Sequence, residues 1–218
     1  MLVVVINNVE EAEDYVLTHP YDQLLDPDGM GIMGYLEIPK IHITLAIYHG
    51  IGKQALENGC GHVEGTSLPI GGKGCHAVLA AHRGLPDAKL FTDLDRMEEG
   101  DEFYLHILDQ ILAYQVDRIR VVRPSEIGGL RIREGRDLVT LLTCTPYGVN
   151  THRLLVRGHR VKYVPAHAEE QAAQAEPVIP YYLAALAAGI AGIIAFLLAG
   201  KVYGKRKRRA RRGRKQEE

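Results

Sequence analysis

Short runs of β-branched and apolar residues, broken at close spacing by Gly, Pro, Asp and Asn, fill residues 31–164. This pattern constrains the fold most, because such runs predict strands and the residues between them predict turns. Strands are expected at residues 33–38, 43–48, 62–64, 76–82, 102–108, 111–122, 137–144 and 153–164. The helices expected here are too short to form a layer of their own: 53–58, 87–94 and 125–128. The sequence therefore predicts an all-β domain, a barrel or a sandwich, with short helical connections.

Charge is divided unevenly along the chain. Residues 1–180 carry 16 Lys and Arg against 25 Asp and Glu, a net charge of −9, whereas residues 181–218 carry 10 against 2, a net charge of +8. No charged residue occurs between Glu176 and Lys201. At about 1.5 Å per helical residue, this run is long enough to cross a hydrocarbon core of about 30 Å. Residues 177–203 are therefore predicted to form a transmembrane helix.

The flanks of this predicted span indicate its orientation. Tyr181, Tyr182 and Tyr203 lie near its ends, where amphipathic rings favour the headgroup level. The basic tail, residues 204–218, follows at once, and the positive-inside rule places it in the cytoplasm. We therefore expect a single-pass cell-membrane protein with its main domain outside the cell. A basic cluster can also bind nucleic acid, but the adjoining apolar run and the lack of a DNA-binding motif favour a lipid membrane as the partner.

Two segments border the strand-rich domain, residues 31–164. Residues 1–30 form an N-terminal segment, acidic from residue 9 onward, with a helix expected around residues 9–17. The apolar stretch at residues 2–6 is short for the hydrophobic region of a signal peptide, so we expect it to be the end of a longer hydrophobic segment. Residues 165–176 are rich in Ala, Glu and Gln and are predicted to remain unpacked, as a stalk that leads to the membrane.

Three cysteines are too few for a dense disulfide framework, so each thiol is judged by its setting. Cys144 ends an apolar run and precedes Thr-Pro-Tyr-Gly, which predicts a position at the mouth of a strand. A thiol there becomes a good nucleophile only beside a base or a cation, and a lone Cys is more often a small buried hydrophobe. Cys60 and Cys75 could form a disulfide outside the cell. A zinc site is disfavoured, because Cys75 and His76 are adjacent on a predicted strand and face opposite sides.

Several stretches around Cys144 and upstream of it carry a family likeness. Residues 140–158 read TLLTCTPYGVNTHRLLVRG, and residues 81–86 read AHRGLP, followed by KLFTDL at 89–94. The stretches GYLEIPK and GHVEGTS stand at residues 34–40 and 61–67. Over roughly residues 20–165, these motifs resemble the class C sortases, the pilin-polymerising cysteine transpeptidases of Gram-positive bacteria. The resemblance implies an eight-stranded sortase β-barrel and no cofactor.

The same resemblance implies roles for individual residues. Cys144 is the expected nucleophile, which attacks the carbonyl between Thr and Gly of an LPXTG-type sorting signal and forms a thioester. His82 is expected to protonate the departing amine and then to deprotonate an incoming pilin lysine. Arg153 is expected to bind the sorting peptide and stabilise the oxyanion, with Thr143 helping to orient it. His152 is adjacent to Arg153 and is expected to face the opposite side of its strand.

A lid is a further expectation from the resemblance. Class C sortases carry an N-terminal Asp-Pro-aromatic motif whose Asp contacts the catalytic Arg and whose ring covers the Cys. This chain has Asp26-Pro27-Asp28, so the ring is absent, although Asp26 could still pair with Arg153. Three other functions remain open: a wall-anchoring sortase, a thiol protease that uses water as the acceptor, and a non-enzymatic pilus scaffold.

Overall fold

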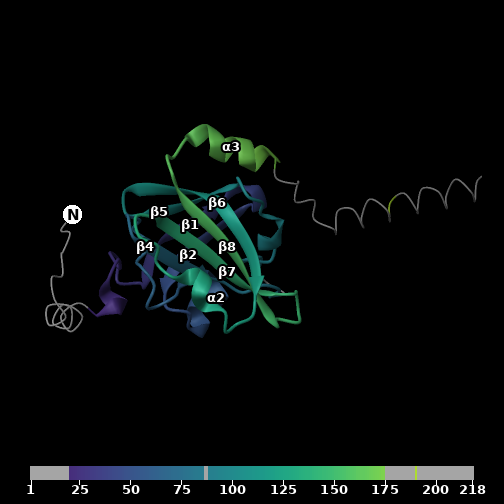
Figure 1. Cartoon of the computed structure of the whole chain (residues 1–218), viewed down its shortest axis with the longest axis horizontal. Helices are drawn as coiled ribbons and strands as arrows, with labels where there is room; N and C mark the ends of the chain where they lie inside the picture. The colour runs from purple at the N-terminus through teal and green to yellow at the C-terminus, as the bar shows by residue number, and fades with distance from the viewer. Residues whose placement is uncertain (1–19, 86–87, 175–189, 191–218) are drawn as a thin grey trace, which may run out of the picture. The chain divides into compact units, whose positions relative to one another are not determined.

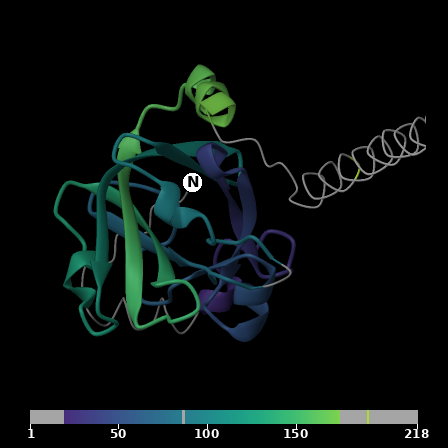
Figure 2. The same ribbon diagram turned by 90° about the vertical axis from the view of Figure 1, so that its right-hand side faces the viewer.

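The computed structural model describes residues 20–85, 88–174 and 190. The chain divides into two compact units, residues 1–176 and 177–218, and every helix and strand with described bounds belongs to the first. Eight strands close into a barrel in the order β1-β2-β3-β4-β7-β8-β6-β5 (Figures 1 and 2). Their bounds are β1 Ile32–Ile38, β2 Ile43–His49, β3 Cys60–His62, β4 Cys75–Ala80, β5 Glu102–Ile107, β6 Gln110–Val122, β7 Asp137–Thr145 and β8 His152–Val161.

The prediction of an all-β domain is confirmed, and closure into a barrel decides between the two predicted architectures. Each of the eight expected strands is present, with bounds that differ from expectation by at most three residues, and the last strand ends at Val161 rather than at residue 164. The third strand is Cys60–His62 rather than residues 62–64, because Glu64 and Gly65 form a turn. The fourth ends at Ala80, two residues before His82. Strands β2 and β3 pair in parallel, as do β4 and β7, whereas the other neighbours are antiparallel.

Alternation along the strands fills the barrel interior with large apolar side chains. Phe103 and Tyr114 stack there with ring centroids 5.7 Å apart. Gly158 of β8 lies against them, and a Cβ atom at this position would stand 2.7 Å from the Phe103 ring. The core therefore depends on a glycine in β8, because any side chain there would displace the aromatic pair.

The short helices agree only partly with expectation. The helix α2 at Lys53–Asn58 is confirmed. The helix expected at residues 87–94 is wrong over the described residues 88–93, which form a bridge and turns before a short 3-10 helix at Leu94–Arg96. Tertiary contacts override helix propensity there, because Leu85 pairs with Ala88 and the segment packs on the barrel core. In place of the short helix expected at 125–128, a 3-10 helix spans Ile127–Leu130.

The predicted stalk is also different. Residues 165–174 form the helix α3, which packs on the segment Pro39–Ile41 and on β5 at one end of the barrel (Figure 1). Its polar side chains reach Glu102, whose carboxylate lies 3.1 Å from His167 Nδ1 and whose backbone N–H donates to Gln171 Oε1 at 3.0 Å. The expectation of an unpacked segment is therefore wrong for these residues, because polar contacts rather than apolar burial hold them to the domain.

The membrane helix predicted at residues 177–203 lies outside the described residues, apart from Ile190. Within the described part of the chain, no helix is both long enough and apolar enough to span a bilayer.

Candidate active site

Three neighbouring strands bring the predicted site residues to one end of the barrel. In the antiparallel pair β7–β8, Cys144 lies directly opposite Arg153. In the parallel pair β4–β7, Ala80 is level with Leu142, so His82, two residues further on, reaches the level of Cys144. Cys144 lies 62 positions after His82 in the sequence, and Arg153 lies 71 positions after it. Strand order and register bring these three segments side by side.

The three residues also share one face of the barrel. Leu141 and Leu154 point into the core. Because side chains alternate along a strand, Cys144, three residues after Leu141, and Arg153, one residue before Leu154, point outward. Just beyond the end of β4, Ala81 belongs to the core, so His82, the next residue, faces outward. All three side chains are partly exposed. The arrangement presents a thiol, an imidazole and a guanidinium to a ligand that lies across the strand ends.

The Arg153 guanidinium, near the start of β8, is held by backbone carbonyls of nearby residues. Its Nη1 donates to the carbonyl oxygens of Asn150, at 3.1 Å, and His152, at 3.0 Å. Over residues 20–85 and 88–174, it has no carboxylate partner, and its Nε and Nη2 make no hydrogen bond. A guanidinium oriented in this way keeps two donors and an uncompensated positive charge for an anionic or developing oxyanion group.

Thr143 makes no hydrogen bond to Arg153, although it was expected to help orient that side chain. Its side chain is 1% exposed and points into the barrel, away from Arg153, in phase with Leu141. Its hydroxyl donates to the carbonyl of Ala81 at 2.8 Å. Thr143 therefore joins the strand of Cys144 to the strand that leads to His82, and the expectation is corrected accordingly.

The segment after His82 folds back on itself. The N–H of Phe91 donates to the His82 carbonyl at 3.1 Å, and the Gly84 N–H donates to Thr92 Oγ1 at 3.3 Å. Lys89 anchors the far side, with Nζ 2.6 Å from the Ile41 carbonyl and 3.2 Å from Asp93. These contacts fix the backbone before residue 86 and after residue 87, and with it the backbone of His82 at the barrel end.

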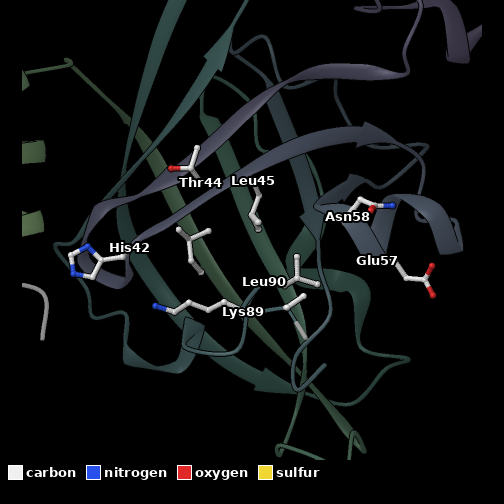
Figure 3. Close-up of a pocket in the computed structure, with 9 residues that line it drawn as sticks. His42, Thr44, Leu45, Glu57, Asn58, Lys89 and Leu90 are labelled. Carbon is white, nitrogen blue, oxygen red and sulfur yellow. The ribbon is translucent and has the colours of Figure 1, made fainter. Parts of the chain in front are cut away.

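A pocket of about 350 Å³ opens beside this segment (Figure 3). It lies between β2, the end of α2 and residues 88–90, with Leu45 and Leu90 at its apolar base. None of His82, Cys144 and Arg153 lines it. The pocket is therefore separate from the site on the outer face of the barrel.

The candidate lid residues make local contacts. Asp26 accepts a hydrogen bond from the Gly31 N–H at 3.0 Å, and no Asp26–Arg153 ion pair occurs among the described residues. The segment is instead docked through Tyr21, whose hydroxyl lies 2.7 Å from His62 Nδ1, and through His49 Nε2, 2.5 Å from the Leu24 carbonyl. Asp26 thus closes a turn, and Pro27 beside it is exposed.

Two further histidines, His62 and His76, are deeply buried. Burial lowers the pKa of His62, against the opposing effect of its hydrogen bond to the Ser67 carbonyl. Burial likewise lowers the pKa of His76, whose Nε2 lies 2.7 Å from Thr140 Oγ1 and whose Nδ1 lies 3.0 Å from the Arg131 carbonyl. Both act as neutral, hydrogen-bonded core groups rather than as part of the outer site.

The other two cysteines do not join. Cys60 is buried beside β2, with Sγ 3.5 Å from the Ala46 carbonyl, and burial raises the pKa of its thiol. Cys75 is the first residue of β4. The strand β3, which carries Cys60, pairs with the other end of β4, where Gly61 lies opposite Ala80. Both thiols are free, so the disulfide that remained open in the sequence is not formed. No group of three potential metal ligands gathers among the described residues.

Known proteins share both the sequence and the fold of this barrel. Residues 36–161 match the family model described as the sortase domain. Sortase A of Streptococcus agalactiae serotype III (strain NEM316) is 28% identical over 137 residues, which cover 62% of this chain and 55% of that protein. The match therefore spans little more than half the length of that relative.

Solved structures are more similar in sequence. The crystal structure of sortase C-1 from Streptococcus pneumoniae is 55% identical with a TM-score of 0.60, covering 62% of this chain and 69% of that chain. Sortase C1 from Streptococcus suis is 48% identical with a TM-score of 0.67, covering 76% of this chain and 92% of that chain. Since the sortase domain accounts for more than half of its residues, the chain belongs to the sortase family, and its structural likeness is to sortases of class C.

Proposed function

We propose that the chain is a cysteine transpeptidase that cleaves an LPXTG-type sorting signal and joins the acyl fragment to a lysine amine of a pilin subunit. The observation that carries the proposal is the convergence of three residues on one outer face of the barrel: Cys144 on β7, Arg153 opposite it on β8, and His82 in the segment that follows β4. A thiol, an imidazole and a guanidinium with free donors are groups that serve acyl transfer through a thioester.

The first half-reaction forms the acyl-enzyme. The Cys144 sulfur attacks the carbonyl carbon of the Thr–Gly peptide bond, and the free donors of Arg153 stabilise the charge that develops on the carbonyl oxygen. The C–N bond breaks as His82 gives a proton to the departing Gly amine. The products are a Cys144 thioester and a free amine on the C-terminal fragment.

The second half-reaction transfers the acyl group. A pilin lysine amine attacks the thioester carbonyl, and His82, now neutral, takes its proton. The carbon–sulfur bond breaks and returns the thiolate of Cys144, which leaves an isopeptide bond. Since the same imidazole acts first as acid and then as base, it must lie within hydrogen-bond reach of both leaving and entering nitrogen atoms.

The test uses the chain with an LPXTG-type peptide and a lysine-bearing pilin acceptor, followed by mass spectrometry. We expect a Cys144 thioester adduct and an isopeptide product in the parental protein, and neither in Cys144→Ala. An acceptor amine of peptidoglycan type that reacts in preference to lysine indicates a wall-anchoring sortase. Hydrolysis without transfer to either amine indicates a thiol protease, and no adduct at all leaves the non-enzymatic scaffold.

We propose in addition that residues 177–203 anchor the protein in the cell membrane as a single span, with the barrel outside and the basic tail inside. The support is the uncharged run between Glu176 and Lys201 and the net positive charge that follows it. Protease added to intact cells should then remove the barrel and protect a fragment that contains residues 204–218. Protection of the barrel, with loss of the tail, would reverse the topology.

A further inference from the structure

The backbone ladder between β4 and β7 stops just before the reacting residues. Its last register pair is Ala80 with Leu142, and the Ala81 N–H donates to the Leu142 carbonyl at 3.2 Å. Beyond this bond, among the described residues, no backbone hydrogen bond joins the segment of His82 to the segment of Cys144. Their separation must therefore be set by side chains.

Two side-chain bonds bracket the level of His82 and Cys144. On one side, the Thr143 hydroxyl donates to the Ala81 carbonyl at 2.8 Å. On the other side, Arg83 Nη1 donates to Thr145 Oγ1 at 3.2 Å. Arg83 is adjacent in sequence to His82, and Thr145 is adjacent to Cys144, so the second bond ties together the immediate neighbours of the two reacting residues.

The guanidinium that makes this bond is immobilised. Arg83 Nε donates to the Thr92 carbonyl at 3.1 Å, and Nη2 forms an ion pair with Asp95. The Arg83 side chain is only 9% exposed. Burying a guanidinium is unfavourable unless its donors are paired, and here each of its three nitrogens has a partner. The planar fork thus acts as a rigid link rather than as a mobile surface charge.

A second contact joins the same two segments. Gly84 has a φ of +85°, and a Cβ atom there would stand 2.9 Å from the ring of Tyr147. Only glycine combines this left-handed conformation with so close an approach. Arg83 and Gly84 therefore dock as a unit on Thr145 and Tyr147, on the side of the reacting pair away from the ladder.

We propose that Arg83 is a positioning residue that holds the His82 imidazole opposite the Cys144 thiol, through its bond to Thr145 and with Asp95 fixing its guanidinium. The inference deepens the proposed function and rests on it for the roles of His82 and Cys144. It assigns to Arg83 no contact with substrate. Its effect arises because reacting groups displaced by about 1 Å can lose about 100-fold in rate.

The principal test measures acyl-enzyme formation from an LPXTG-type peptide. Arg83→Met, which keeps the apolar stem, should lower kcat by about 10- to 100-fold with KM changed less than about twofold. Thr145→Val, which keeps the β-branched shape, should lower kcat by about fivefold, the effect of one lost hydrogen bond. Arg83→Lys should recover part of the Arg83→Met loss. If Arg83→Met and Thr145→Val both have the kcat of the parental protein, the inference is overturned.

A second measurement separates positioning from general damage to the fold. Alkylation of Cys144 by iodoacetamide needs no sorting peptide, so it tests Arg83 even if the proposed function fails. Arg83→Met should slow this alkylation in the parental chain and leave it within about twofold in a His82→Ala chain, because its effect acts through His82. An equal slowing in both chains shows a structural role and overturns the inference.

The matched control is Arg136→Met. Arg136 is also an arginine paired with a carboxylate, 3.4 Å from Asp117, but it lies before β7 at the end away from Cys144 and is 53% exposed. It should leave kcat and alkylation unchanged. Absence of a parental acyl-enzyme, with alkylation still dependent on Arg83 and His82, contradicts the proposed peptide chemistry while supporting the positioning role.

Discussion

The same three strands, with the segment that follows one of them, carry two groups of similar composition, one buried and one exposed. On the outer face, β4, β7 and β8 contribute a histidine, a hydroxyl and an arginine. At the barrel end, the segment after β4 contributes a histidine, β7 a thiol and β8 an arginine. The buried group is His76, Thr140 and Arg157, and the exposed group is His82, Cys144 and Arg153.

Partners distinguish the two groups. His76 uses both ring nitrogens, toward Thr140 and the Arg131 carbonyl, and Arg157 forms two bonds to Asp117 at 2.8 and 3.0 Å. Among the described residues, Arg153 bonds to two backbone carbonyls, those of Asn150 and His152, and to no side chain. Residue types therefore do not by themselves define the candidate site. It arises where the strand ladder ends and the polar groups are left for a ligand.

The largest expected effect comes from removing the exposed guanidinium. Arg153→Met should lower the rate of acyl-enzyme formation by about 100-fold or more, because an oxyanion donor is lost. The melting temperature should change by less than about 2 °C, since the two bonds lost are on an exposed loop. Rapid-mixing mass spectrometry and a thermal melt measure the two quantities. A large drop in melting temperature would place Arg153 with the buried group.

Arg157, the buried counterpart of Arg153, should affect stability rather than activity. Arg157→Met leaves the carboxylate of Asp117, which is 18% exposed, with weaker partners in Arg136 and His159. We expect a loss of about 2 to 3 kcal/mol in the free energy of unfolding, measured with urea, because one half of a largely buried pair is removed. The specific activity of the fraction that remains folded should be unchanged. A stable but inactive Arg157→Met would instead connect the two groups functionally.

The buried histidines predict a pH dependence of stability. The folded-state pKa of His76 and of His62 lies below the ordinary value of about 6.5, so below that pH the unfolded chain binds more protons. Stability should therefore fall as pH drops through 6.5 toward the folded pKa, by at most about 1.4 kcal/mol per pH unit for each histidine. His76→Gln should reduce this slope in urea titrations at pH 7.5 and 5.5. An unchanged slope would show that His76 is not the source.

The smallest effect is expected at the candidate lid. Asp26 bonds to Gly31 and not to Arg153, so Asp26→Ala should leave hydrolysis of a sorting peptide within about twofold of the parental rate. Turnover assays under identical conditions measure this ratio. Clearly faster hydrolysis would reinstate a latch on the active site, in a conformation different from this one.

Much of the fold could be predicted from local pattern. All eight strands were expected, because β-branched runs and turn residues are short-range signals, and the errors fall at strand ends such as Glu64 and His82. The segment at residues 88–93 was mispredicted as helix because its conformation depends on Leu85, Leu90 and Phe91 packing on the barrel. The helix α3 was missed because polar contacts with Glu102, remote in sequence, hold it.

The sequence by itself determined the strands, the turn residues and, through its motifs, which His, Cys and Arg belong together. Only the tertiary structure decided that Thr143 supports Ala81, that Asp26 closes a turn, and that Arg83 reaches Thr145. The physical reason is distance along the chain. Strand formation depends on neighbours within a few residues, whereas the Thr143–Ala81 and Arg83–Thr145 contacts depend on barrel order and register, which bring together segments 62 positions apart. The Asp26–Gly31 bond spans five residues and depends on the conformation of its turn.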